Sequence, residues 1–391
     1  HLTMARVAER FGATEEDIAQ VEDALESVGA SGTLHPSGGL LEAELTVAQA
    51  EDLLGVSMVQ GTDGDGRTFV RPAGEPSVPD TLAPAVTEVA GLARTVAASD
   101  QEPVGESSTT TAAAPPLDAG SCTAARSALS ALHGRYGISS LHEAGIKGTG
   151  AKVAVASLDL PDPTSTGLWS ACLGIDAPPV VAVAADSAFG SAPDAEIDLD
   201  MATLMAALPG AGGFEVVVFD RYGWVGAPIA TVLAGQNLPD TISTSVGFCE
   251  SDLTEDAVTL GEWLFATAAA VGVTVVASAG DDGSSACSPS SADAAVQYPA
   301  SSAWVTSVGG TQVGADGAEV VWSDEGAMLA GGGGSSGLIG IPQWQADSGV
   351  DGDRRSVPDL AALAAPGSWP PIPVCSDGSC EWLPVGGTSA A

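Results

Sequence analysis

Hydrophobic and polar positions follow one pattern before about residue 100 and a different one after it. In the first part, apolar residues recur every three or four positions, which predicts a capped amphipathic helix from Thr14 to Gly29. The same pattern predicts a second helix from Val47 to Leu54, ended by Gly55. Residues 39–46 alternate as in a strand, and the Asp-Gly-Asp-Gly run at 63–66 predicts a hairpin turn. These elements predict a small α+β domain.

Residues 97–121 are rich in Ser, Thr, Ala, Pro and acidic residues and show no apolar periodicity. Such a composition is typical of a linker. Exposed linkers are cut most easily by proteases, so we expect processing in or near residues 100–121.

From residue 122 onward, short apolar strands alternate with helical stretches. This alternation predicts right-handed β-α-β crossovers and a parallel sheet covered by helices on both faces. The active site of such a fold lies beyond the carboxyl ends of the strands. The predicted segments are Lys152–Leu158, Leu199–Ala207, Phe214–Phe219, Pro228–Leu233, Thr241–Val246, Ala257–Ala270, Val273–Ser278, Trp304–Val313 and Glu319–Trp322.

The charge balance narrows the classes of partner. Twelve Lys and Arg stand against 50 Asp and Glu, a net charge of −38, which excludes a basic nucleic-acid surface. A surface rich in carboxylates suits either high salt or a medium acid enough to protonate the carboxylates. The most apolar window, Leu264–Gly280, is shorter than the roughly 20 residues that cross a membrane, so we interpret it as core.

The six cysteines have no C-x-x-C spacing and few histidines near them, which favours disulfides in an oxidising compartment over a zinc site. Cys375 and Cys380 bracket a turn-forming insert and are expected to close a small hairpin loop. The pairing of the other four is open: Cys122, Cys172, Cys249 and Cys287.

The first candidate for chemistry is Ser389, within the run of small residues at 386–391. Small residues allow a tight turn that places a serine hydroxyl at the start of a helix, and such a serine is a candidate nucleophile. The same residues also form ordinary loops and helix N-caps. All four histidines precede residue 143, so a Ser-His-Asp triad is poorly supported.

Carboxylates are the other candidates. Glu196 and Asp200 are four residues apart and share one face of a predicted helix, where like charges raise the pKa of one of them. The alternative is that they are acids favoured by the helix dipole. Asp281 directly follows a predicted buried strand, at the active edge of the sheet, although acids there also form turns.

These residues resemble the sedolisin family of serine-carboxyl peptidases, acid-acting relatives of the subtilisins, over nearly the whole chain. The family pattern E-x-x-x-D before an apolar helix ending in P-G-A matches Glu196, Asp200 and residues 209–211. The S-x-G-D-x-G segment is similar to residues 278–283, and the G-T-S-A motif of the nucleophile matches residues 387–390. Further similar stretches are Tyr298–Ser302, Gly309–Thr311, Gly331–Ser335 with Pro342, Arg355–Asp359 and, in the activation propeptide, residues 2–55.

The resemblance implies a subtilisin-like, doubly wound, mostly parallel α/β sheet for residues 122–391. It implies a ferredoxin-like α+β activation propeptide for residues 1–96, joined by the linker and processing region 97–121. The propeptide would act as an intramolecular inhibitor of a monomeric enzyme.

The resemblance also implies a role for each catalytic residue. Ser389 would attack the scissile carbonyl while Glu196 accepts its proton, and Asp200 would orient Glu196 and share a proton with it. Asp281 would donate a hydrogen bond to the oxyanion and must be protonated to do so. A carboxyl base with a pKa near ~4 and a neutral acid donor both imply action at acid pH.

The sequence departs from the family in three places. Asp282 stands where a Ser is common and would raise the pKa of Asp281. Val246 replaces a Trp that supports an extended carboxylate network in some members. Family members continue past the nucleophile through a helix and a calcium-binding loop, so we expect this sequence to be a fragment, its calcium ligands to lie beyond Ala391, and the 391 residues alone to be inactive.

The sequence therefore predicts a secreted, acid-acting serine endopeptidase made as a zymogen, with polypeptide substrates and no nucleic-acid or membrane partner. The alternative is a catalytically inactive secreted homologue that acts as a binding or surface protein. The presence of Glu196, Asp200, Asp281 and Ser389 together favours the enzyme.

Overall fold

The computed structural model describes residues 1–63, 66–74, 76, 78–96, 118–185, 195–286, 293–376 and 378–391. Most of the predicted linker, residues 97–117, lies outside the described residues, as does Cys287. Helix α4 begins at Ala119, three residues before the predicted start of the peptidase domain.

The N-terminal part is the small α+β domain that the periodicity predicts. Thr14 caps α2 in a reciprocal capping box with Asp17, and Gly55 ends α3 in the left-handed conformation at φ 61°. The strands on either side of the predicted 63–66 turn pair antiparallel. Strands β1 and β2 form one small sheet, and β3, β4 and β5 form another. The elements of this domain are α1 Met4–Phe11, α2 Glu15–Ser27, β1 Gly32–Leu34, β2 Leu41–Ala43, α3 Val47–Leu54, β3 Met58–Thr62, β4 Thr68–Pro72 and β5 Arg94–Thr95.

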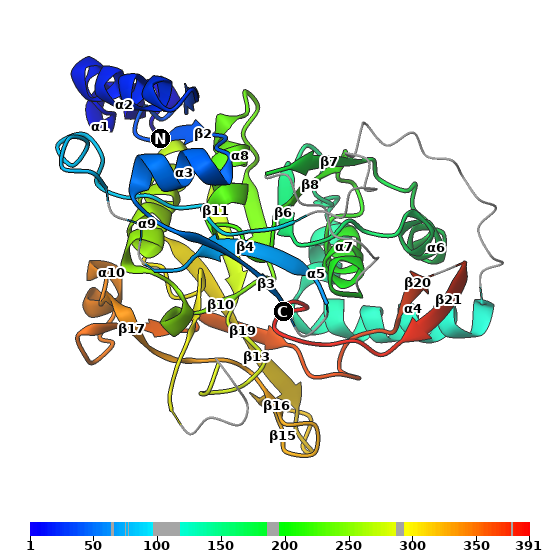
Figure 1. Cartoon of the computed structure of the whole chain (residues 1–391). Coiled ribbons are helices and arrows are strands. Elements are labelled where there is room, and N and C mark those ends of the chain that lie inside the picture. Colours follow the sequence, from blue (N-terminus) through cyan, green and yellow to red (C-terminus); the bar gives the residue numbers. More distant parts are fainter. Residues whose placement is uncertain are drawn as a thin grey trace.

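The second part is built on an eight-stranded, mostly parallel sheet in the order β14-β13-β11-β9-β6-β8-β7, with β19 also paired to β13 (Figure 1). Only the β13–β14 pair is antiparallel among these described strands. The strands are β6 Val153–Ser157, β7 Val180–Ala184, β8 Phe214–Val218, β9 Thr241–Thr244, β11 Thr274–Ser278, β13 Val305–Val313, β14 Glu319–Val321 and β19 Leu360–Leu363. This confirms the predicted doubly wound α/β fold.

Strand β6 shows why both faces of the sheet are covered. Its five residues are all buried, and because successive side chains point to opposite faces, Ala154 and Ala156 enter one core while Val153 and Val155 enter the other. Helices α8 and α9 cover the first face, and α4, α6 and α7 the second. The helices are α4 Ala119–Arg135, α5 Ile138–Glu143, α6 Pro163–Leu173, α7 Ala195–Ala207, α8 Ala227–Ala234, α9 Glu255–Val271 and α10 Gln343–Asp347.

Short antiparallel pairs complete the domain: β10 Phe248–Cys249 with β12 Gln297–Tyr298, β15 Ser323–Asp324 with β16 Leu329–Ala330, β17 Gly334–Gly340 with β18 Arg354–Val357, and β20 Ile372–Ser376 with β21 Ser379–Leu383. The last pair carries the Cys375–Cys380 disulfide, which confirms the predicted hairpin closure. A second disulfide joins Cys122 to Cys172, and Cys249 is also disulfide-bonded. Within the described ranges, no helix is both long and apolar enough to cross a membrane.

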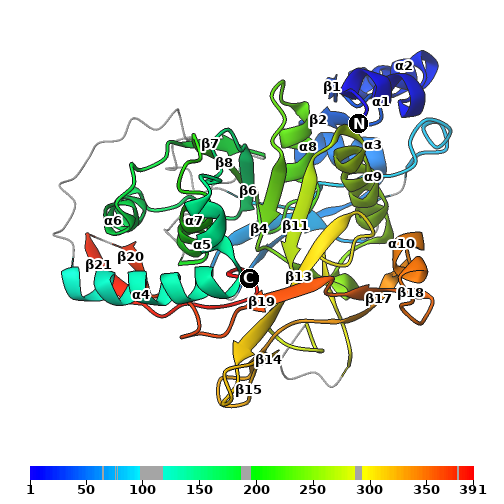
Figure 2. The same cartoon turned by 180° about the vertical axis from the view of Figure 1, so that it is seen from behind.

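The N-terminal domain docks against α8 and α9 (Figure 2). The imidazole of His35, 3% exposed, donates from Nε2 to the carbonyl of Ala230 in α8 at 2.9 Å. The amide of Leu2 donates to the carbonyl of Ala270 in α9 at 2.8 Å. The N-terminal domain therefore contacts backbone acceptors of the second domain.

One contact between the two domains joins like charges. Glu88 of the N-terminal domain lies beside Asp256 and Glu255 at the start of α9. Burial, a hydrogen bond to Asp256 and the charges of both acids raise the pKa of Glu88 to about 7. Docking therefore favours a shared proton at this contact.

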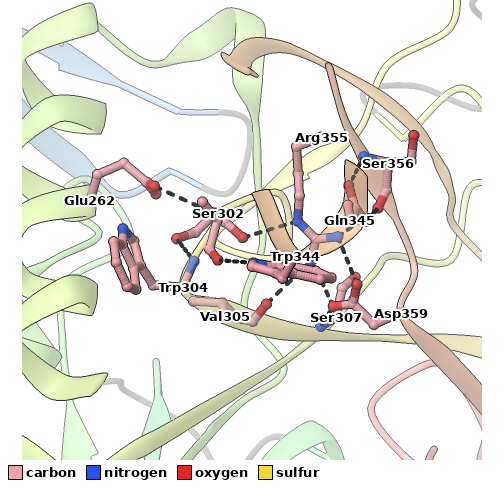
Figure 3. A network of polar contacts seen from close by, with 11 residues as sticks. Glu262, Ser302, Trp304, Val305, Ser307, Trp344, Gln345, Arg355, Ser356 and Asp359 are labelled. Atoms are coloured by element: carbon pink, nitrogen blue, oxygen red, sulfur yellow. Dashed lines mark hydrogen bonds and ion pairs between the residues drawn. The ribbon is translucent and has the colours of Figure 1, made fainter. Parts of the chain in front are cut away.

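A buried arginine holds together the strands that lead to the end of the chain (Figure 3). Arg355 is 0% exposed, and its guanidinium makes two bonds to Asp359 at 2.7 and 2.6 Å while its carbon lies 4.8 Å from the ring centroid of Trp344. It also donates to the carbonyls of Ser302, Val305 and Ser356. The network fixes the start of β19 against β13.

We expect Arg355→Lys to lower the free energy of unfolding by about 2–4 kcal/mol, because an ammonium group cannot replace the two-pronged bond and the three carbonyl bonds. Urea unfolding measures the change. The control is Arg354→Lys at the exposed neighbour, which should change stability by less than about 0.5 kcal/mol. Equal effects of the two substitutions would contradict the importance of the buried network.

Glu88→Gln should stabilise the protein at pH 8 more than at pH 5. The pKa of Glu88 is raised from 4.5 to about 7, so its contribution to stability is complete below about 4.5 and is lost as the pH rises through about 7. Glutamine carries no charge at either pH, so the melting temperature at pH 8 should rise by about 1–3 °C relative to wild type. Glu22→Gln, at an exposed position on α2, is the control, and a pH-independent effect of Glu88→Gln would refute the shared proton.

Candidate active site

The predicted catalytic residues gather around the carboxyl edge of the parallel sheet. Strands β9 and β11 are neighbours, with Thr244 level with Ala277, so Ser245 and Asp281 follow adjacent strand ends. The hydroxyl of Ser278 bonds the carbonyl of Ser245 at 3.2 Å, which ties the two loops together. This is the edge at which ligands bind in such folds.

Asp281 is held by the residue that precedes the predicted nucleophile. Both the amide and the hydroxyl of Thr388 donate to Asp281 Oδ1, at 2.7 and 2.9 Å, and the Thr388 hydroxyl accepts from the amide of Gly280 at 3.1 Å. These contacts join segments 107 residues apart. They bring Asp281 against the turn that carries Ser389.

The two oxygens of Asp281 have different surroundings. Thr388 supplies both of its hydrogen bonds to Oδ1, which leaves Oδ2 to carry the proton when the group is neutral. A methyl group added to Gly387 would stand only 2.7 Å from Oδ2, so the glycine leaves room for that oxygen. Gly387 has φ +137°, a backbone conformation that other residues adopt with strain.

Burial raises the pKa of Asp281, and the neighbouring charge of Asp282 raises it further, against the two bonds from Thr388 that lower it. The predicted effect of Asp282 is confirmed in direction, with burial as the larger cause. The site therefore favours the neutral form of Asp281 compared with an exposed aspartate.

Glu196 and Asp200 both lie on α7, as their spacing predicts. Asp200 is 5% exposed, and burial together with the charge of Glu196 raises its pKa well above the ordinary value. The hydroxyl of Ser245 donates to Asp200 Oδ1 at 2.6 Å and lowers that pKa in part. The pair behaves as two close carboxyls that favour a shared proton.

The turn with Ser389 is anchored on both sides. The amide of Gly387 donates to the carbonyl of Ala364, just after β19, at 2.7 Å, and the amide of Ala390 closes the turn on Gly387. Ser389 is half-buried, whereas Ala390 is buried in the same core as Ile197 and Leu199 of α7. The turn and α7 therefore pack into one hydrophobic cluster.

The structure thus joins Asp281 to the Ser389 turn and places Glu196 and Asp200 together on α7. The contact from Ser389 to Glu196 that general-base catalysis requires stays a prediction. Sequence reasoning did not assign a role to Ser245 or Thr388. Ser245 directly follows a strand of the parallel sheet, and this position in the sequence could have indicated that it lies near the candidate site.

Among the residues that the structure describes, no three His, Cys, Asp or Glu side chains gather so as to hold a metal ion. The donor set within these ranges therefore does not fit a calcium site. Calcium stays a prediction of the family resemblance, and no catalytic step described below passes through it.

Comparisons with known proteins identify the family of the chain. The family described as Pro-kumamolisin, activation domain, matches residues 1–95. Kumamolisin from Bacillus sp. (strain MN-32) is 30% identical over 421 residues, covering 100% of this chain and 72% of Kumamolisin. Sedolisin from Pseudomonas sp. (strain 101) is 39% identical over 147 residues, covering 34% of this chain and 25% of Sedolisin.

A solved structure shows the same fold. It is Pseudomonas sedolisin, a serine-carboxyl proteinase, complexed with two molecules of pseudo-iodotyrostatin, with a TM-score of 0.52 and 28% sequence identity over 62% of this chain and 72% of that one. Because the similarity to Kumamolisin extends through both the activation domain and the peptidase domain, the chain belongs to the sedolisin family of serine-carboxyl peptidases and has the form of a zymogen.

Proposed function

We propose that this protein is an acid-acting serine endopeptidase in which Ser389 is the nucleophile, Glu196 the general base, Asp200 the residue that orients Glu196, and Asp281 the oxyanion donor. One observation carries the proposal most directly. Thr388, adjacent to Ser389, donates twice to Asp281 Oδ1, so the proton of neutral Asp281 resides on Oδ2 beside the nucleophile turn.

The proposed reaction forms and breaks bonds in two stages. Ser389 Oγ attacks the scissile carbonyl carbon while its proton moves to Glu196, and the new oxyanion accepts a hydrogen bond from Asp281. The C–N bond then breaks, and Glu196 returns the proton to the leaving amine. Water then attacks the acyl-enzyme while its proton moves to Glu196. The bond from the acyl carbon to Ser389 Oγ breaks, and Glu196 returns the proton to Oγ, which releases the acid product and restores the enzyme.

Acid conditions follow from the protonation states that these steps need. Asp281 must be neutral to donate, and its pKa is raised by burial, so the donor is present in acid and is lost as the pH rises through that pKa. Glu196 must be ionised to accept the proton from Ser389. Sharing a proton with Asp200, whose pKa is raised well above the ordinary value, keeps the pair at one negative charge over a wider pH range.

The same proposal covers the setting of the enzyme. The activation domain acts as an intramolecular inhibitor, the substrate is a polypeptide, and the processed enzyme is monomeric and secreted. Support for secretion comes from the disulfides, which persist in oxidising compartments.

The first test is proteolysis of a denatured protein against pH, with the full product of the natural gene. Wild type should be active only in acid, and Ser389→Ala and Glu196→Gln should each lose about 10⁴-fold or more in kcat/KM. Ser323→Ala, an exposed serine on β15, should keep full activity. Processed, folded wild type without activity at any pH would instead support the inactive binding homologue.

Asp281→Asn should extend activity toward higher pH. An asparagine amide donates at every pH, so the alkaline fall in kcat/KM that follows ionisation of Asp281 should move upward or disappear, whereas Asp281→Ala should lose about 10²–10³-fold throughout. Asp282→Asn is the matched control, because removal of its charge lowers the pKa of Asp281 and should move the alkaline fall downward. An unchanged alkaline limb in Asp281→Asn would exclude Asp281 as the oxyanion donor.

A further inference from the structure

Asp220 is a buried carboxylate that the proposed catalytic steps do not use. It comes two residues after β8, and the amide of Phe219 bonds the carbonyl of Ser157 at 3.0 Å, which continues the β6–β8 pairing to this point. Asp220 is therefore at the same carboxyl edge of the sheet as Ser245 and Asp281. It is 3% exposed while the propeptide is in place.

A single propeptide residue binds this carboxylate through both its main chain and its side chain. The amide of Thr95 donates to Asp220 Oδ2, and the hydroxyl of Thr95 donates to Oδ1 at 2.7 Å. The amide of Tyr222 also donates to Oδ1, at 2.9 Å, and orients the carboxylate. Every peptide residue except proline offers the amide, but only serine and threonine add an aliphatic hydroxyl at this position.

The segment 219–225, here called the Asp220 loop, has further contacts with the propeptide. The ring of Phe69 stacks on Tyr222 with centroids 4.8 Å apart, and the Tyr222 hydroxyl donates to Asp63 at 2.8 Å. These contacts come from β4 and from the end of β3, and β5 with Thr95 pairs with β4. In Figure 1 these propeptide strands cross in front of the main sheet. The Asp220 loop is thus a surface that accepts extended polypeptide.

The position of Asp220 along the edge matches the reach of a bound peptide. Strands β8, β6, β9 and β11 are successive neighbours, so Asp220 and Asp281 follow strands three spacings apart. Three spacings of about 4.8 Å amount to about 14 Å, which an extended chain covers in about four residues. A peptide that runs along this edge from β8 toward β11 therefore places its Asp220-bound residue about four residues before the scissile bond.

We propose that Asp220 is a substrate-specificity residue that selects serine or threonine about four residues before the cleaved bond, and that Thr95 occupies this subsite as a substrate mimic in the zymogen. This inference rests on the proposed peptidase function. Asp220 would then recognise a substrate side chain at the carboxyl edge of the sheet, apart from the residues that carry out the reaction.

The test compares kcat/KM of the processed enzyme on peptides of equal length that carry Thr, Ser or Val at the third, fourth or fifth position before the scissile bond. Wild type should prefer Thr and Ser over Val by about tenfold or more at one of these positions, the value expected for a hydrogen bond to a charged acceptor. Asp220→Ala should reduce that ratio to about one, and Asp220→Asn should leave an intermediate ratio, because its amide oxygen still accepts.

Asp240→Asn is the matched control, since Asp240 is an exposed aspartate just before β9, at the opposite edge of the sheet, and should leave the ratio unchanged. The peptide panel on wild type needs no variant, so poor folding of Asp220→Ala does not prevent a decision. If wild type cleaves all peptides with equal kcat/KM, or if Asp220→Ala keeps the preference, the inference is overturned while the peptidase function stands.

Two further outcomes also decide the matter. If Thr95→Val changes the rate of zymogen processing but the processed enzyme shows no hydroxyl preference, Asp220 is only a propeptide anchor and the inference is overturned. If wild type cleaves no peptide under conditions where it is processed and folded, the proposed function fails, and the subsite fails with it.

Discussion

The two hydrogen bonds from Thr388 to Asp281 Oδ1 are the interaction on which the proposed active site depends. They position the turn of Ser389 relative to the loop after β11, and they determine which oxygen of Asp281 can carry a proton. Both partners lie on anchored backbone, because Gly387 bonds the end of β19 and Asp281 follows a central strand of the sheet. A loss of alignment in β19 would therefore disturb the proposed nucleophile and the proposed oxyanion donor together.

This dependence gives the Arg355 network a role beyond stability. Arg355 and Asp359 fix the start of β19 against β13, and the carbonyl just after β19 receives the amide of Gly387. The chain is extended between these two points, so a displacement at Asp359 is passed to Ala364 with little attenuation. The buried ion pair thus supports the geometry of a turn that it does not touch.

Sequence patterns predicted those parts of the fold that local chemistry controls. The capping box at Thr14, the glycine stop at Gly55 and the Cys375–Cys380 closure are all decided within a few residues. The strand order and the bond from Ser245 to Asp200 could not be obtained in that way, because they join segments that only the folded sheet brings together. Asp281 could be predicted only in part. Its position directly after a buried strand can be recognised from neighbouring residues, but its partner Thr388 is 107 residues away in the sequence.

The propeptide interface shows how acid can activate the proposed enzyme without loosening every contact. Protonation of Glu88 removes its repulsion with Asp256 and Glu255, so this contact is stronger in acid than above a pH of about 7. The same change in pH favours the neutral Asp281 that the proposed reaction needs. At these two places acid strengthens a propeptide contact and favours the proposed catalytic protonation state together. In the proposed mechanism, acid therefore does not free the propeptide by weakening the Glu88 contact, and its release depends on cleavage of the connecting segment.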